Sequence, residues 1–269
     1  MSQAPIPESG FTEDRLLDGR VLLRQPADGF RAAIDPVMLA SAVAAEPGQS
    51  VLDIGTGSGA AALCLAWRLG QVRVTGLEIQ RDLVRLASEN AALNGFEGRV
   101  QAMLGDVRAP PLRLAPGSFD HVMTNPPYLE AGTATLPADA ARATAVGEGA
   151  ELRVWLRFAL AMLRDRGSLT IVHRADRLDA ILAALLGQAG DIVVFPLWPG
   201  TGKAAKRMLV RARKGVATPL RLAAGLVLHE GDGRFTVEAD AVLRGRAHID
   251  LSGAGPAGLD QAVRLLPSA

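Results

Sequence analysis

Apolar residues are concentrated in seven short runs, at 50–54, 72–77, 99–104, 119–124, 167–173, 191–197 and 207–214. Runs of this length and composition predict buried strands. Between them, helical periodicity extends over 58–69, 80–94, 148–165 and 176–189. This alternation predicts an α/β fold with a doubly wound, mostly parallel, seven-stranded sheet. Ligands of such sheets bind at the carboxyl ends of the strands.

The ends of the chain depart from this alternation. Residues 1–14 are polar and contain prolines, so we expect a loose N-terminus. Pro36 opens an apolar segment that is expected to be a helix with Asp35 as its N-cap. Residues 226–236 predict an extended run with a turn, followed by a short helix over 237–244. The Gly/Ala/Pro-rich tail from Gly253 is expected to fray.

Composition limits the class of protein. A chain of 269 residues with 49% hydrophobic residues is long enough for one large α/β unit. We divide it into an N-terminal extension, 1–47, and a main domain with a short C-terminal extension, 48–269, packed as one globular unit. The single cysteine, Cys64, excludes an intramolecular disulfide and is expected to be buried. We find no signal peptide, no membrane-spanning run and no metal-ligand spacing, so we expect a cytoplasmic protein.

A glycine loop follows the first predicted strand of the main domain. Its sequence is Val51-Leu52-Asp53-Ile54-Gly55-Thr56-Gly57-Ser58-Gly59, and a helical run follows. Glycines let the backbone turn sharply and approach a ligand, and the helix N-terminus supplies free N–H groups. Glu78 ends the next predicted strand, about 20 residues on, where an acid can hold ribose hydroxyls.

The glycine loop by itself fits two kinds of ligand. Gly55-x-Gly57-x-x-Ala60 also satisfies the relaxed fingerprint of dinucleotide-binding proteins. Asp53 favours the other kind, because a carboxylate beside the loop repels a pyrophosphate and attracts a ligand with a sulfonium and an ammonium group. The plain alternative is a structural turn before a helix.

Asn125-Pro126-Pro127-Tyr128 follows the fourth strand of this set. Each proline fixes its own φ and holds the preceding residue extended, which aims the Asn125 side chain and the Pro126 carbonyl outward. Two rigid acceptors beside the Tyr128 ring suit a planar group that carries an NH2, such as adenine or a carboxamide. The plain alternative is a strand-ending turn, since Asn and Pro are common turn residues.

With Gly105-Asp106, these segments resemble the ordered motifs of class I S-adenosylmethionine-dependent methyltransferases. More narrowly, the chain resembles the bacterial adenine-N6 methyltransferases of valine tRNA. The strong match covers about 50–130, with weaker likeness at 29–35 and 206–210. The release-factor glutamine-N5 methyltransferases share the tetrapeptide and are the closest competitors. The resemblance implies S-adenosylmethionine as cofactor, and it gives Asp35 a second interpretation, an acid near the cofactor.

The expected site is then complete. The residues expected to bind the cofactor are Asp35, Asp53, Gly55, Thr56, Gly57, Gly59, Glu78, Ile79, Asp106, Val107 and Asn125. Catalysis is assigned to Asn125, Pro126 and Tyr128. Asp106 could accept from the adenine amine or be a turn aspartate, and Ile79 and Val107 could sandwich the ring or belong to the core. His121 and His173 are expected to be structural.

The segment 198–229 contains no acidic residue. Its cations include Lys203, Lys206 and Arg207, which could follow an RNA backbone. The plain alternative is a solvated face balanced by acids elsewhere. Three functions therefore remain: an RNA adenine-N6 methyltransferase, which the basic segment favours, a protein-glutamine methyltransferase, and a non-catalytic RNA-binding relative. Residues 129–147 are expected to form a lid or substrate loop.

Overall fold

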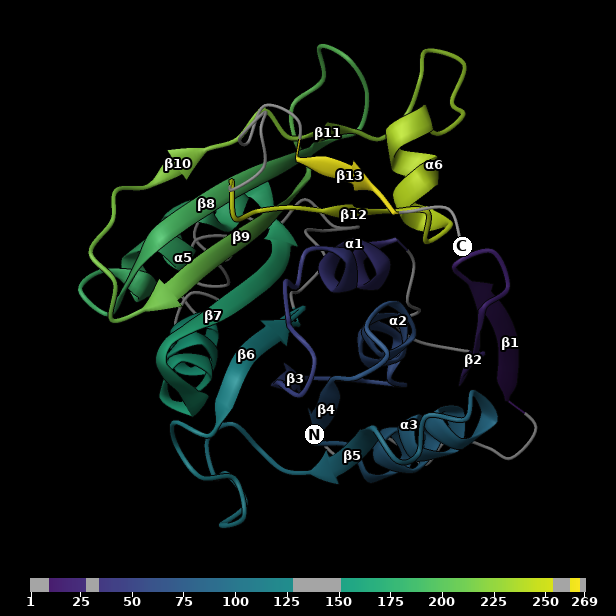
Figure 1. The fold of residues 1–269 in the computed structure, drawn as a ribbon, viewed down its shortest axis with the longest axis vertical. Coiled ribbons are helices and arrows are strands. Elements are labelled where there is room, and N and C mark those ends of the chain that lie inside the picture. The colour runs from purple at the N-terminus through teal and green to yellow at the C-terminus, as the bar shows by residue number, and fades with distance from the viewer. Residues whose placement is uncertain (1–9, 28–33, 128–150, 254–261, 267–269) are drawn as a thin grey trace, which may run out of the picture.

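The computed structural model describes residues 10–27, 34–127, 151–253 and 262–266. Its main sheet has nine strands in the order β10-β8-β9-β7-β6-β3-β4-β5, with β11 beside β8 (Figure 1). The strands are β3 (Ser50–Ile54), β4 (Arg73–Glu78), β5 (Val100–Leu104), β6 (Phe119–Thr124), β7 (Leu163–Arg174), β8 (Ala189–Trp198), β9 (Arg207–Lys214), β10 (Arg221–Leu222) and β11 (Leu226–Val227). All seven predicted strands are present. Within this sheet β9 alone runs antiparallel to its neighbours.

Helices cover both faces of the sheet. They are α1 (Asp35–Ser41), α2 (Ala60–Arg68), α3 (Arg81–Leu93), the short η1 (Ala175–Arg177), α5 (Leu178–Leu185), α6 (Val237–Leu243) and a helix over 151–162. Val51 and Met123 pack in the hydrophobic cluster of α1 and α2, whereas Leu52 and Val122 pack with α5 and the helix over 151–162. Successive strand residues thus point to opposite layers, which confirms the doubly wound prediction.

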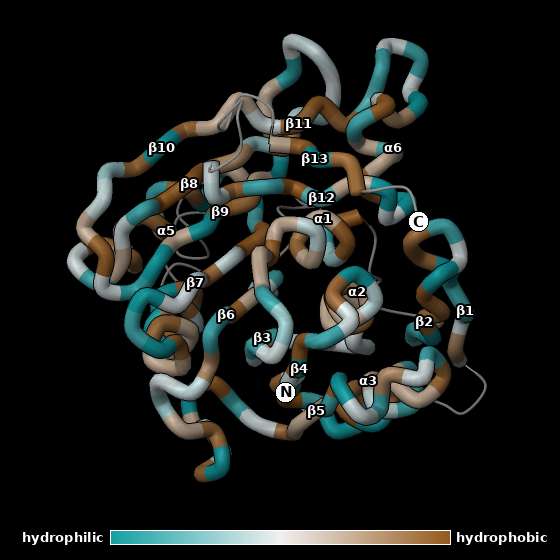
Figure 2. The backbone as a smooth tube through the Cα atoms, viewed as in Figure 1, coloured by the Kyte–Doolittle hydropathy of each residue, from teal (hydrophilic) through white to brown (hydrophobic). Residues whose placement is uncertain are grey.

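Helix α3 has one buried and one exposed face, which agrees with the amphipathic periodicity that predicted a helix here. Its buried residues are Leu86, Ala87, Asn90 and Ala91, and hydrophilic (teal) and hydrophobic (brown) bands alternate along this helix in Figure 2. In the central strands β3 and β6, by contrast, the residues toward the carboxyl end, 51–54 and 122–124, are all buried. Burial on both faces explains why these stretches are mostly apolar.

Strand order changes direction at β3, which pairs with β4 on one side and β6 on the other. Ile54 lies opposite Leu77 in β4 and opposite Thr124 in β6. The segments that follow these strands therefore start at the same edge of the sheet. This is the crevice position expected for ligands of doubly wound sheets.

The N-terminal prediction was wrong for part of its range. Residues Phe11–Leu16 form β1, which pairs antiparallel with β2 (Val21–Pro26). The hairpin is held by α3, because the side-chain amides of Asn90 and Asn94 bond to the backbone of Arg24 and Leu22 at 2.7–2.9 Å. These side-chain amides form hydrogen bonds with the backbone of β2, as a neighbouring strand would. The local sequence around them gives no sign of this contact.

The C-terminal region adds a small second layer. Helix α6 confirms the short helix expected there, and the Thr236 hydroxyl caps it by accepting from the Ala239 N–H at 3.2 Å. Beyond it, β12 (Ala247–Ile249) pairs antiparallel with β13 (Val263–Leu265). The expectation of a frayed tail is thus wrong for this part, because pairing with β12 orders it.

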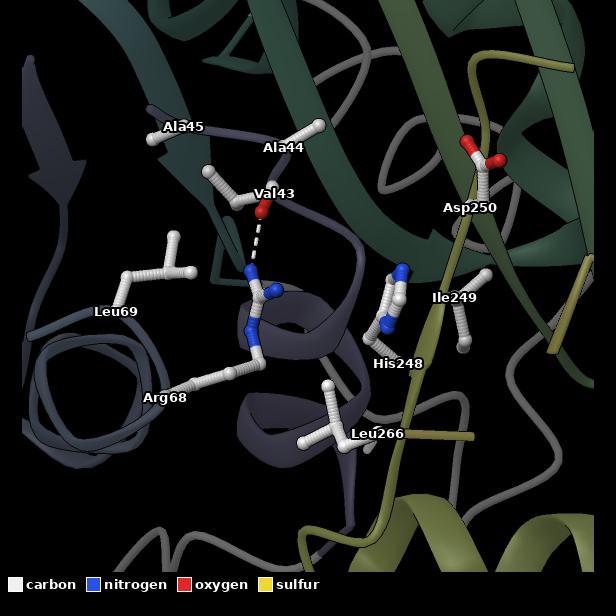
Figure 3. Close-up of a pocket in the computed structure, with 9 residues that line it drawn as sticks. All are labelled: Val43, Ala44, Ala45, Arg68, Leu69, His248, Ile249, Asp250 and Leu266. Atoms are coloured by element: carbon white, nitrogen blue, oxygen red, sulfur yellow. Dashed lines mark hydrogen bonds between the residues drawn. The ribbon is translucent and has the colours of Figure 1, made fainter. Parts of the chain in front are cut away.

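A cavity of about 300 Å³ lies where β12 covers the ends of α1 and α2 (Figure 3). Arg68 reaches into it, and its guanidinium donates to the carbonyls of Ala40, at 2.9 Å, and of Val43. Helix α2 begins at the glycine loop and ends at Arg68, so this cavity is at the opposite end of the helix from that loop.

In the described part of the chain, no helix is long and apolar enough to cross a membrane.

Candidate active site

The glycine loop, residues 55–59, connects β3 to α2. Gly55, Gly57 and Gly59 have φ values of 72°, 58° and 91°, which L-residues with a side chain rarely adopt. The N–H groups of Gly55 and Thr56 donate to the Leu77 carbonyl at 2.8 and 3.1 Å, which fixes the loop to β4. A side chain on Gly55 would also collide with Trp155, 2.9 Å from its ideal Cβ position. The loop therefore has a fixed shape, with the first turn of α2 behind it.

Two acids are buried beside this loop. Asp53 is 2% exposed and accepts from the Thr56 hydroxyl at 2.7 Å. Burial raises the pKa of Asp53 to about 7; the Thr56 hydrogen bond opposes the rise, and the nearby Glu78 charge adds to it. Glu78 accepts from the Gly57 N–H at 3.0 Å and, through its other oxygen, from the Gln80 N–H at 2.9 Å. Each carboxylate oxygen of Glu78 keeps a lone pair for a further donor.

The loop after β5 brings a third acid to the same edge. Gly105 is needed there, because a Cβ would lie 2.6 Å from Pro111 and 2.7 Å from Leu77. Asp106 accepts from the Arg108 N–H at 2.8 Å, so the turn interpretation of this aspartate is correct, and it does not exclude a ligand on the second oxygen. Ile79 is 62% exposed and is not a core residue, whereas Val107 packs partly against the core.

Asn125 lies directly beyond β6, next to the glycine loop. The Thr124 hydroxyl donates to the Ile54 carbonyl at 2.8 Å and accepts from the Trp155 indole N–H at 2.8 Å, which joins β6, β3 and the helix over 151–162. The Asn125 Oδ1 atom is buried and has no hydrogen-bond partner among the described residues. Pro126 is buried as well. Tyr128 and the expected lid, 129–147, lie outside the described residues.

The structure corrects the interpretation of Asp35. The N-cap position of α1 is Ile34, and the Asp35 side chain makes no capping bond. Its carboxylate instead pairs with Arg207 at the start of β9, with 3.1 Å between Oδ2 and Nε. Pro36 confirms the predicted proline in the first turn. The second interpretation of Asp35, a position near the cofactor, stays a prediction.

The basic segment divides into two groups. Arg211 and Arg221 both pair with Asp191, at 3.1 and 2.8 Å, so the alternative of balance by acids elsewhere holds for them. Lys203 and Lys206 are exposed. Arg207 is held by Asp35, as described above, and is less available to RNA than the sequence suggested.

The sequence did not predict the residues that pack against the glycine loop and hold it in place. Trp155 packs on Gly55, and Asn90 donates to the Ser58 carbonyl at 2.9 Å. Neither residue belongs to a motif, and each acts across a long separation. His121 was assigned correctly: its ring is held by Ser168 and Gln49 at 2.7 Å each, and burial lowers its pKa to about 4. Among the described residues no His/Cys/Asp/Glu group could hold a metal ion.

Comparison with known proteins places this geometry in a family. The model of the methyltransferase small domain matches residues 33–192. A tRNA1(Val) (adenine(37)-N6)-methyltransferase from Tolumonas auensis is 31% identical over 156 residues, which are 57% of this chain and 63% of that protein. A release factor glutamine methyltransferase from Chlorobaculum tepidum is 34% identical over 131 residues, 47% of this chain and 44% of that protein. The matched region thus spans less than two thirds of either relative.

A solved structure extends the likeness to most of the chain. The crystal structure of a predicted O-methyltransferase from Agrobacterium tumefaciens has a TM-score of 0.68 and 30% sequence identity. The match covers 80% of this chain and 98% of that one. The family and the fold imply S-adenosylmethionine as the cofactor. The chain belongs to the methyltransferase small domain family.

Proposed function

We propose that the protein is an S-adenosylmethionine-dependent N-methyltransferase that acts on an exocyclic amine, N6 of an adenine in tRNA. The observation that carries the proposal is the buried Asn125 Oδ1 at the end of β6, which has no hydrogen-bond partner in the part of the chain that the structure describes. An unpaired buried acceptor costs about 1–3 kcal/mol, so such atoms are uncommon and call for an explanation. A substrate N–H that binds there would satisfy it.

The acceptor suits the electronic problem of an aromatic amine. The lone pair of such an NH2 group is delocalised into the ring, which makes the nitrogen a poor nucleophile. Asn125 Oδ1 and the Pro126 carbonyl would each accept one N–H, which favours a pyramidal nitrogen and frees the lone pair. The amine proton leaves only after the new C–N bond forms, so no strong base is required beside Asn125. Stacking of the base on Tyr128 would complete the pocket.

The described residues fit the cofactor. S-adenosylmethionine supplies an electrophilic methyl group on a positively charged sulfur. Buried acids at the glycine loop suit a cation and disfavour the pyrophosphate of a dinucleotide. In this proposal Glu78 accepts from the ribose hydroxyls and Asp106 accepts from the adenine amine. Asp53 and the backbone of the glycine loop, at Gly55, Gly57 and Gly59, surround the amino-acid end of the cofactor. Ile79 and Val107 flank the adenine ring. Thr56 holds Asp53 in place.

The identity of the acceptor rests on two further supports. The Tolumonas relative is named for an adenine in tRNA. Lys203 and Lys206 are exposed at the same edge of the sheet, where a polyanion could approach. The second candidate is a protein glutamine, because a carboxamide presents the same NH2 and the Chlorobaculum relative is named for it. Incubation with labelled cofactor and either total RNA or release factors separates the two.

The decisive variant is Asn125→Ala. Interactions that strengthen in the transition state affect kcat more than KM, and loss of one such group typically lowers the rate by about 10²–10³-fold. We expect that loss in single-turnover methylation at saturating cofactor, with cofactor affinity nearly unchanged. Asn94→Ala is the matched control, because it removes a half-buried amide that holds β2 and lies at the C-terminal end of α3, away from the carboxyl ends of the strands. A folded Asn125→Ala protein with the wild-type rate would reduce the tetrapeptide to a turn.

We also propose that the whole chain works as one unit, with 48–269 as the methyltransferase domain and 1–47 as its extension. The described part of the extension is packed on the domain: Val37, Leu39 and Leu23 lie in the same hydrophobic cluster as α2.

A further inference from the structure

A hollow of about 480 Å³ lies beside the end of β8, and the reaction proposed above does not use it. It is lined by Trp198, Gly200, Thr201, Gly202, Lys203, Ala204 and Val227. Trp198 is the last residue of β8, and Leu197 lies opposite Arg207, the first residue of β9. Since β8 runs parallel to β6, this end of β8 is at the same edge of the sheet as Asn125.

The Trp198 indole is held in a fixed position. Its N–H donates to the Ala224 carbonyl at 3.0 Å, and Gly225 packs so closely that a Cβ there would lie 2.7 Å from the indole nitrogen. Gly225 also has a φ of 86°. Glycine is therefore required at this position both for the backbone conformation and for the close approach of the indole ring. The side chain is half-buried and forms part of the wall of the hollow. A fixed aromatic ring loses little entropy when a planar ligand stacks on it.

Lys203 lines the same hollow as this ring, and Lys206 follows three residues later in the chain. The turn Gly200-Thr201-Gly202-Lys203 is closed by a bond from the Lys203 N–H to the Gly200 carbonyl at 3.1 Å. The Lys203 side chain runs past Gly200, whose ideal Cβ position lies 3.5 Å from the lysine Cδ. Neither Lys203 nor Lys206 forms an ion pair within the described chain, and both are exposed. An aromatic platform next to unpaired lysines is the combination that binds single-stranded nucleic acid.

We propose that this hollow binds a nucleobase of single-stranded RNA that flanks the methylated adenine, stacked on Trp198 with its phosphate near Lys203 and Lys206. This inference rests on the proposed function. Three strand spacings separate β6 from β8, which is roughly 14 Å at about 4.8 Å each. The hollow therefore holds a base a few nucleotides from the target rather than an immediate neighbour.

The test is binding of a short fluorescein-labelled oligoadenylate, measured by anisotropy without cofactor. Trp198→Ala should weaken binding by about 5- to 150-fold, the range for loss of one base–aromatic stack. Trp198→Phe should retain most of the affinity and lose the quenching of tryptophan fluorescence that stacking produces in the wild type. Phe235→Leu is the control, because Phe235 is 39% exposed and stacks on His229 but does not line the hollow.

Each outcome decides the proposal. Equal affinity of Trp198→Ala and wild type, or an equal loss in Phe235→Leu, would overturn it. Absence of wild-type binding to the oligoadenylate would overturn it as well, even if labelled methyl groups then appeared on release factors. If the oligoadenylate binds through Trp198 but total RNA takes up no methyl group, the hollow stands and the proposed reaction fails.

Discussion

Replacement of Asp53 by Asn should make the protein more stable at neutral pH while it weakens cofactor binding. Burial raises the pKa of Asp53 from its usual 3.8 to about 7. The folded state therefore holds this proton more tightly than the unfolded state does. The stability that the protonated group contributes is fully present below about pH 3.8 and is lost as the pH rises through about 7. An asparagine has no such loss.

The magnitude follows from the two pKa values. A difference of about 3 corresponds to roughly 4 kcal/mol, of which about 3 kcal/mol falls between pH 5 and pH 8. The amide keeps an acceptor for the Thr56 hydroxyl, so packing should change little. With a urea m-value of about 3 kcal/mol/M, the unfolding midpoint of Asp53→Asn should rise by about 1 M relative to wild type across this range.

The assay is urea unfolding of the cofactor-free protein at several pH values. Comparing variant and wild type at each pH cancels the other titrating groups. If the two midpoints shift in parallel, Asp53 ionises normally in the folded protein and the burial argument is wrong. A second measurement tests the predicted role of Asp53 in cofactor binding. The cationic cofactor beside the Asp53 carboxylate favours the charged form of that carboxylate. Binding near pH 7 should therefore release a proton from Asp53 in the wild type and none in the Asp53→Asn variant. Calorimetry in two buffers of different ionisation enthalpy detects it.

Three further outcomes are expected. Glu78→Ala should lower cofactor affinity at least tenfold, because charge-assisted bonds contribute about 1.5–3 kcal/mol each and the Gly57 N–H loses its acceptor; unchanged affinity by calorimetry would contradict the assignment. Arg68→Met should lower the free energy of unfolding by about 1–3 kcal/mol, because two carbonyls at the end of α1 lose their hydrogen-bond donor. The affinity for the cofactor should stay unaltered. A variant as stable as wild type would mean that these carbonyls find other partners. Changing Lys203 and Lys206 together to Ala should flatten the salt dependence of RNA binding by about 0.7 per lost contact on single strands. An unaltered slope would show that this face does not meet phosphate.

Much of the fold could be predicted because its signals are local. The order of strands and helices follows from apolar runs and helical periodicity, and the strand ends from Gly55, Gly105 and Asn125-Pro126. A glycine at positive φ or a proline restricts the backbone wherever it stands in the sequence. The convergence of these segments on one edge followed from the parallel order of the strands, and the register at Ile54 agrees with it.

The misses share one feature: each depends on a remote partner. The prediction of a loose N-terminus over 1–14 is wrong for the first part of β1, because Asn90 and Asn94, which hold its partner strand β2, are 66 and 72 residues away from the positions that they contact. Asp35 looked like a helix cap and is instead paired with Arg207, 172 residues further along the chain. The ordered tail at β13 depends in the same way on β12.

The sequence by itself determined which segments of the main domain form strands and helices and in which order they follow along the chain, and it supplied the chemical groups of the site, since propensity, periodicity and turn chemistry act over a few residues. Only the tertiary structure decided the state of those groups. Packing of distant segments buries Asp53 and raises its pKa, leaves Asn125 Oδ1 without a hydrogen-bond partner among the residues described, and fixes the Trp198 ring against Gly225. Desolvation and hydrogen-bond satisfaction depend on which surfaces meet in space, and no local stretch of sequence records that.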